Sequence, residues 1–168
     1  MASLTLSYKW LFFTKPQGPP QPVPEGLERH WIDTPGGKLE ILSATPSHTP
    51  APGSPPVFFC HGGMGSAWVW TDYMRYLAAR GVASYAISLR GHGDSWHPPY
   101  LRMVFATTRR MLGDDLVAGV EWAEAREGCE VILVGHSSGG GLSQGVLSEG
   151  RLDVRALALL GAVPAYGS

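Results

Sequence analysis

Short apolar runs recur along the chain, with segments of helical spacing between them. An uninterrupted apolar run of this kind is typical of a strand that is buried on both faces. Apolar residues that recur every three or four positions predict helices. The predicted strands are 57–60, 82–87, 131–134 and 154–160, and the predicted helices are 67–80, a segment within 100–126, and 138–148. Strands that alternate with helices indicate a parallel sheet covered on both faces.

The chain before these strands predicts a hairpin. Segments 28–33 and 38–43 lie on either side of Thr34-Pro35-Gly36-Gly37, which is typical of a turn. Residues 1–27, rich in proline over their second half, are predicted to be an extended N-terminal arm. The expected fold class is therefore α/β, with one domain over 28–168. Its sheet is mostly parallel, with an N-terminal antiparallel hairpin and helices on both faces.

The most informative motif joins the predicted strand 131–134 to the predicted helix 138–148. It reads Gly135-His136-Ser137-Ser138-Gly139. Glycines two positions before and after Ser137 leave room for the chain to reverse beside it. A serine on such a strand–turn–helix junction is held in a cramped conformation with its hydroxyl clear of the sheet. Ser137 is therefore a candidate nucleophile.

Composition narrows the classes of partner. The formal net charge is −1 and no run of like charges occurs, which predicts no nucleic-acid binding. No Cys/His spacing resembles a metal site, and Cys60 and Cys129 are predicted to be reduced packing residues. The apolar patch at 10–13 is too short to span a bilayer and lacks a signal peptide's features. We therefore expect no stable membrane insertion and a cytoplasmic location.

Four motifs, in their order along the chain, resemble those of the α/β-hydrolase family (AB hydrolase-1 type serine hydrolases). They are the hairpin, His61-Gly62-Gly63 after a buried strand, Leu89-Arg90-Gly91-His92-Gly93-Asp94-Ser95 after the next strand, and the turn at Ser137. The resemblance covers about residues 28–165 and implies the N-terminal half of that fold. Relatives commonly carry an acidic residue where this chain has Ser88.

The resemblance also implies roles for site residues. Ser137 would be the nucleophile. The backbone N–H groups of Ser138 and of Gly63 or Met64 would form an oxyanion hole. The substrate would be a small molecule, a carboxylic ester or a related acyl compound. Acyl chemistry of this type requires neither a metal nor an organic cofactor, and none is expected.

Other polar residues are expected to be structural. His61 is interpreted as a hydrogen-bonding residue at the mouth of the oxyanion loop. Arg90 and Asp94 are expected to pair within a turn. Asp114 and Asp115 lie within a predicted helix, where we expect solvated or capping roles.

The proton acceptor that a serine nucleophile needs is missing from the pattern. In the family, an acid and then a histidine follow the nucleophile. No histidine follows Ser137 here, and the acids Glu149 and Asp153 are expected at the opposite end of the sheet. His136 precedes the nucleophile and, by strand alternation, should point away from it. The resemblance therefore predicts a related serine hydrolase that is inactive as written.

A fold that lacks its last strands would leave the predicted strand 154–160 as an open apolar edge. Such an edge favours self-association. Two interpretations stay open. The chain is a fragment or shortened form of an ester hydrolase, or it is a non-catalytic binding or regulatory fragment that uses the exposed sheet edge.

Overall fold

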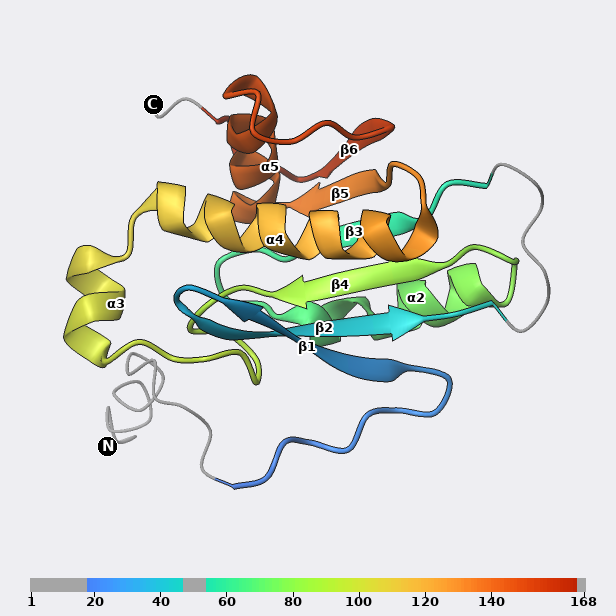
Figure 1. Ribbon diagram of the computed structural model, residues 1–168, viewed down its shortest axis with the longest axis horizontal. Helices are drawn as coiled ribbons and strands as arrows, with labels where there is room; N and C mark the ends of the chain where they lie inside the picture. Colours follow the sequence, from blue (N-terminus) through green and yellow to red (C-terminus); the bar gives the residue numbers. More distant parts are fainter. Residues whose placement is uncertain (1–17, 47–53, 166–168) are drawn as a thin grey trace, which may run out of the picture.

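A computed structural model describes residues 18–46 and 54–165. They form a six-stranded sheet in the order β1-β2-β4-β3-β5-β6 (Figure 1). Strands β1 and β2 form the predicted antiparallel hairpin, and β2 pairs antiparallel with β4. Strands β3, β4, β5 and β6 run parallel, which confirms a mostly parallel sheet. The bounds are β1 Glu28–Thr34, β2 Gly37–Ala44, β3 Val57–Cys60, β4 Ser84–Ser88, β5 Ile132–His136 and β6 Ala156–Leu160.

Helices cover both faces of the sheet, as predicted. Figure 1 shows α4 in front of the sheet and α2 behind it. The predicted helix 67–80 begins as a short 3-10 turn, and the predicted helix within 100–126 is two helices. Thr107 is extended, and Thr108 caps the second helix by accepting from the N–H of Met111 at 3.2 Å. The bounds are η1 Ala67–Trp70, α2 Thr71–Ala78, α3 Tyr100–Ala106, α4 Arg109–Glu127 and α5 Ser138–Ser148.

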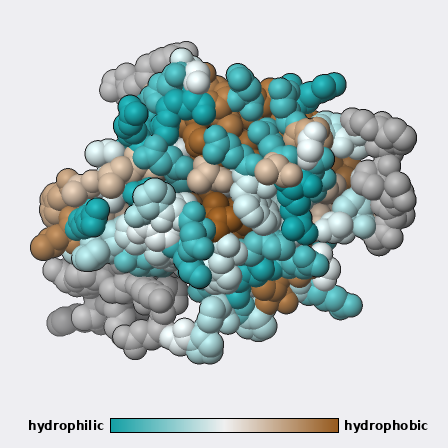
Figure 2. Space-filling model, viewed as in Figure 1, coloured by the Kyte–Doolittle hydropathy of each residue, from teal (hydrophilic) through white to brown (hydrophobic). Residues whose placement is uncertain are grey.

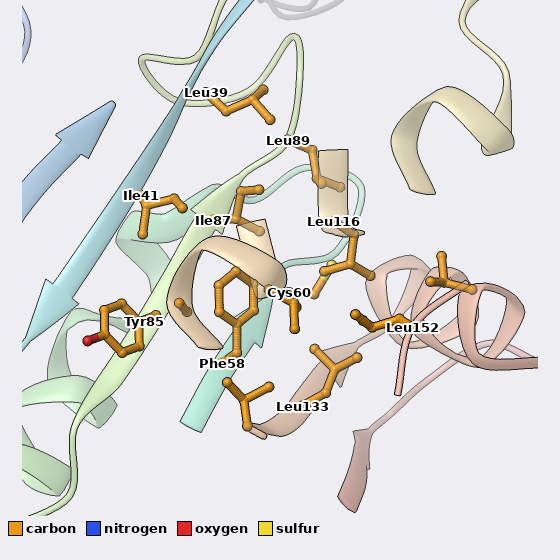
Figure 3. Packing of buried hydrophobic residues seen from close by; sticks show 14 of the residues in the cluster. Leu39, Ile41, Phe58, Cys60, Tyr85, Ile87, Leu89, Leu116, Leu133 and Leu152 are labelled. Carbon is orange, nitrogen blue, oxygen red and sulfur yellow. The ribbon is translucent and has the colours of Figure 1, made fainter. Parts of the chain in front are cut away.

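The apolar run of β3 serves two cores because neighbouring residues on a strand face opposite sides. Phe58 packs under α4 with Leu116 and the strand residues Ile87 and Leu133 (Figure 3). Phe59 faces the other way and stacks on the Trp70 ring, with centroids 4.7 Å apart. The uninterrupted apolar sequence therefore reflects burial on both faces of the strand.

The predicted pairing of Arg90 with Asp94 is wrong. The Arg90 guanidinium donates to both carboxylate oxygens of Asp115, at 2.7 and 2.6 Å, and Asp94 instead accepts from Arg29 at 3.0 Å. Asp115 is only 1% exposed, so a solvated role for it is also wrong. The reason is that the two acids are neighbours on α4 and face different ways. Asp115 points inward to Arg90, and Asp114 points outward and accepts from Arg151.

The site of Ser88 contains a carboxylate that comes from another strand. Glu40 of β2 is fully buried, and its side chain accepts from the Ser88 hydroxyl at 2.7 Å. It also accepts from Trp68 Nε1 at 3.1 Å, the Asp94 N–H at 3.1 Å and Arg29 Nε at 2.9 Å. These bonds tie the hairpin to the loops that follow β3 and β4.

Residues 18–27 belong to no helix or strand, although Leu27 is buried and Val23 packs against the core behind the sheet. The rest of the predicted arm, and the apolar patch at 10–13, lie outside the described residues. Cys60 is buried as predicted, but Cys129 is exposed and therefore packs in no core. In the portions 18–46 and 54–165, no helix combines the length and apolar character needed to cross a membrane.

Candidate active site

Ser137 occupies the sharp turn between β5 and α5. Its φ is 51° and its ψ is −123°, and it has the only positive φ of a non-glycine residue in the described part of the chain. Such a conformation costs about 1–3 kcal/mol and persists only where neighbouring structure holds it. Here the Ser137 N–H donates to Leu160, and its carbonyl oxygen accepts from Gly140, Gly141 and Val163. These bonds fix the turn from both sides.

The glycines on either side of Ser137 are required by packing. A Cβ at Gly139 would lie 2.2 Å from the carbonyl oxygen of His61, and a Cβ at Gly135 would lie 2.6 Å from the Cα of Gly140. Both contacts are with backbone, which cannot easily move aside. The two glycines therefore let the start of α5 lie against β5 and against the loop after β3.

The loop after β3 lies directly against this turn. A Cβ at Gly62 would lie 3.0 Å from Ser137 Cβ, and one at Gly63 would lie 3.3 Å from Ser138 Oγ. The loop is closed by a hydrogen bond from the Gly65 N–H to the Gly62 oxygen at 3.0 Å. Within the described residues, the N–H groups of Gly63, Met64 and Ser138 donate to no protein acceptor. Ser138 opens α5, so its N–H also lies at the positive end of a helix dipole.

Two cavities meet at this loop and share Gly62, Gly63 and Ser138 in their walls. One, of about 330 Å³, is walled mainly by apolar side chains, including Leu89, Leu112, Leu142 and Val163. The other, of about 550 Å³, is lined by both Ser137 and His136. Strand alternation therefore does not remove His136 from the neighbourhood of Ser137, because the positive φ of Ser137 ends the regular strand.

His61 has the structural role that the sequence predicts. It is 1% exposed, and its Nδ1 lies 2.7 Å from the Gly62 oxygen. Its Nε2 accepts from the Leu89 N–H at 3.1 Å, so the ring is neutral and protonated on Nδ1. Burial lowers the pKa of His61 to about 4, against a smaller opposing effect of the hydrogen bond to Gly62. The ring thus fastens the loop after β3 to the end of β4.

The free energy of unfolding is expected to fall as the pH drops from about 6.5 toward 4. Because the folded state keeps the pKa of His61 below its ordinary value, the stabilisation is complete above pH 6.5 and is lost as the unfolded chain takes up a proton. The loss attributable to this ring is about 3 kcal/mol. Urea unfolding at several pH values measures it, with His61→Gln as the non-titrating control. Equal pH slopes in both proteins would contradict this role.

His92 also holds the loop after β3. Its Nε2 lies 2.9 Å from the Gly63 oxygen and its Nδ1 lies 3.0 Å from the Arg90 oxygen. Its ring centroid is 4.8 Å from that of His61. Over residues 18–46 and 54–165, no histidine is hydrogen-bonded to Ser137 Oγ, and no group of metal-ligating side chains occurs.

Solved structures of epoxide hydrolases and of a thioesterase domain share this fold. Epoxide hydrolase VrEH1 from Vigna radiata superposes with a TM-score of 0.66 at 22% identity, over 83% of this chain and 39% of its own. A thioesterase domain from the curacin biosynthetic pathway gives a TM-score of 0.62 at 24% identity, over 84% of this chain and 49% of its own. An epoxide hydrolase from an endophytic Streptomyces gives 0.61 at 24%, over 81% and 37%. The chain therefore spans less than half the length of these structures, and at these identities the likeness concerns the fold.

A profile of the α/β hydrolase family matches residues 57–168, which include β3, the loop after it and the turn at Ser137. This match covers more than half of the chain. It agrees with the sheet order and with the strained serine between β5 and α5. The chain belongs to the α/β hydrolase family.

Proposed function

We propose that this chain provides the nucleophile and the oxyanion hole of a serine hydrolase that acts on carboxylic esters or related acyl compounds. The observation that carries the proposal is the conformation of Ser137, a non-glycine residue held at φ 51° where β5 meets α5. Ser137 lines a cavity, and a serine strained in this way typically carries its hydroxyl clear of the sheet. Some proteins of this fold carry an aspartate as the nucleophile at this turn, and the serine found here instead favours acyl transfer.

In the proposed reaction, Ser137 Oγ attacks the carbonyl carbon of the ester. The carbonyl oxygen becomes negatively charged and accepts hydrogen bonds from the N–H groups of Ser138 and of Gly63 or Met64. These donors belong to the main chain, so the Met64 side chain, which is 80% exposed, has no part in the step. This placement is supported by how closely the two donor segments lie, since a Cβ at Gly63 would be only 3.3 Å from Ser138 Oγ.

We further propose that the 168-residue polypeptide alone is not a competent esterase. Attack by serine requires a base that takes its proton. The ring nitrogens of His61 and His92 lie at hydrogen-bond distance from backbone groups of the loops after β3 and β4. No histidine follows Ser137 in the sequence. His136 lines the cavity beside Ser137, but within the described residues no hydrogen bond joins its ring to Ser137 Oγ. The proposal therefore places the base outside the described residues.

Hydrolysis of an activated short-chain ester tests this. The wild-type chain and Ser137→Ala are expected to release the alcohol at the same slow rate. Without a base, only the oxyanion hole and binding contribute, and together they accelerate hydrolysis about a thousandfold over the uncatalysed reaction. A chromogenic acetate ester is a suitable substrate. Turnover that disappears in Ser137→Ala would refute the proposed inactivity.

The alternative function, a binding or regulatory fragment, is favoured by one observation. In the described sheet, β6 pairs with β5 on one side only. Its residues carry no charge, and Leu159 and Leu160 are 44% and 42% exposed. An uncharged, apolar strand with an unpaired edge can add a strand from another chain.

Self-association of the purified chain is the expected result of this edge. Sedimentation velocity at micromolar concentration should detect dimers or larger species, and Leu159→Lys should shift them toward monomer because a lysine blocks edge pairing. Val69→Lys, at a comparably exposed apolar residue of η1, is the control. A monodisperse wild-type monomer would contradict the prediction.

A further inference from the structure

Helix α3 carries its apolar side chains on the outside. None of its residues is buried, and Leu101 and Phe105 are 68% and 80% exposed. At 3.6 residues per turn these two side chains share one face, and Met103 lies on the opposite one. Met103 contacts the body of the protein, because a Cβ at Gly91 would lie 2.8 Å from its Cε. Figure 2 shows brown and tan atoms at the left of the view, where Figure 1 places α3.

The chain around α3 is cationic. Residues 95–113 contain no aspartate or glutamate, but they contain Arg102, Arg109 and Arg110. All three arginines are exposed. Arg109 donates to the carbonyl oxygens of Ala165 and Gly141, so no carboxylate neutralises it there. The exposed apolar face of α3 is thus flanked by positive charge.

Nearby carboxylates have cationic partners of their own. Arg102 borders a cavity that is also lined by Asp33 and Asp114. Asp33 lies 3.9 Å from the Lys38 ammonium, and Asp114 binds Arg151. The positive charge of Arg102 is therefore available to an outside anion.

We infer that α3 and the start of α4 form a docking surface for an anionic lipid bilayer. This surface, the α3 surface, consists of Leu101, Val104 and Phe105 together with Arg102 and Arg110. Exposed leucine and phenylalanine beside arginines, without acids among them, match the interfacial zone of a membrane, where apolar side chains enter the acyl boundary and cations meet anionic headgroups. Binding is peripheral, since α3 is too short to span a bilayer.

Docking would bring the end of the sheet where the parallel strands finish, and where Ser137 lies, toward the bilayer. Met103 contacts the loop that follows β4, and Ser137 follows β5, which runs in the same direction. The inference does not depend on the proposed chemistry, because it concerns α3 and not the serine. It can hold in a chain that has no esterase activity.

Flotation of the full 168-residue protein with lipid vesicles tests the inference. Wild-type protein should bind vesicles of phosphatidylcholine and phosphatidylserine about tenfold or more tightly than vesicles of phosphatidylcholine alone. Leu101→Ser/Phe105→Ser should weaken binding to the anionic vesicles by about tenfold or more. Arg102→Gln/Arg110→Gln should bring the affinity close to that for the neutral vesicles.

The matched control is Tyr73→Ser/Tyr76→Ser on α2, where the two tyrosines are 58% and 57% exposed. It should bind like wild type, and all variants should keep the thermal unfolding transition of the wild type. Absence of wild-type binding to anionic vesicles would overturn the inference. So would wild-type affinity in Leu101→Ser/Phe105→Ser, whichever other segment then bound the lipid, or an equal loss in the α2 control.

Discussion

Asp115→Ala is expected to lower the free energy of unfolding by about 3–5 kcal/mol, because it leaves a buried charge without its partner. The Arg90 side chain is 6% exposed and donates two short hydrogen bonds to the Asp115 carboxylate. The backbone N–H of Arg90 also donates to Asp115 Oδ2, at 3.1 Å. Its guanidinium also lies 5.5 Å from the centroid of the Trp96 ring. Removal of the carboxylate therefore affects the whole loop after β4.

Urea unfolding measures this effect, and the neighbouring residue is its control. Asp114, on the same helix, forms an ion pair with Arg151, but its side chain is 55% exposed. Asp114→Ala should therefore lower the free energy of unfolding by less than about 1 kcal/mol. The double variant Arg90→Met/Asp115→Leu should recover much of the loss, since it removes both charges together. A loss in Asp115→Ala no larger than that in Asp114→Ala would contradict the account.

Features with a local signal could be predicted from the sequence. The hairpin turn, the apolar runs of β3 and β5 and the turn at Ser137 each depend on residues within a few positions of one another. The break between α3 and α4 was missed, although Thr108 before Arg109 is a typical helix cap. The apolar spacing of the long segment concealed this signal because it continues across the break.

Long-range polar contacts could not be predicted. Arg90 and Asp115 are 25 residues apart, and Glu40 and Ser88 are 48 apart. A buried ion pair has no periodic pattern in sequence, since it needs only one residue on each of two elements. Arg109, which holds the segment after β6 against the start of α5, was missed for the same reason. Turn residues, helix caps and apolar runs thus predict the helices and strands, whereas long-range side-chain contacts determine the conformation of the loops around the site.

Loss of the Ser137 hydroxyl should abolish covalent labelling of the chain by a fluorophosphonate, although it leaves the slow release of alcohol from an ester unchanged. A fluorophosphonate reacts when a serine oxygen attacks phosphorus, fluoride leaves and a base takes the hydroxyl proton. In this chain the turn and the oxyanion donors are proposed to be in place while the base is not. Reaction should therefore be slow but confined to Ser137. Added imidazole should accelerate it by about tenfold, less than the hundredfold or more of a positioned base.

The most direct test of the central claim is the site and rate of that reaction, measured by mass spectrometry with and without imidazole. The account predicts a single adduct on Ser137, faster with imidazole, absent in Ser137→Ala and retained in Ser138→Ala, whose N–H is unchanged. An adduct on another residue, or equal labelling of Ser137→Ala, would contradict the assignment of the nucleophile. Rapid labelling of Ser137 that is independent of imidazole would contradict the claim that the chain lacks its base.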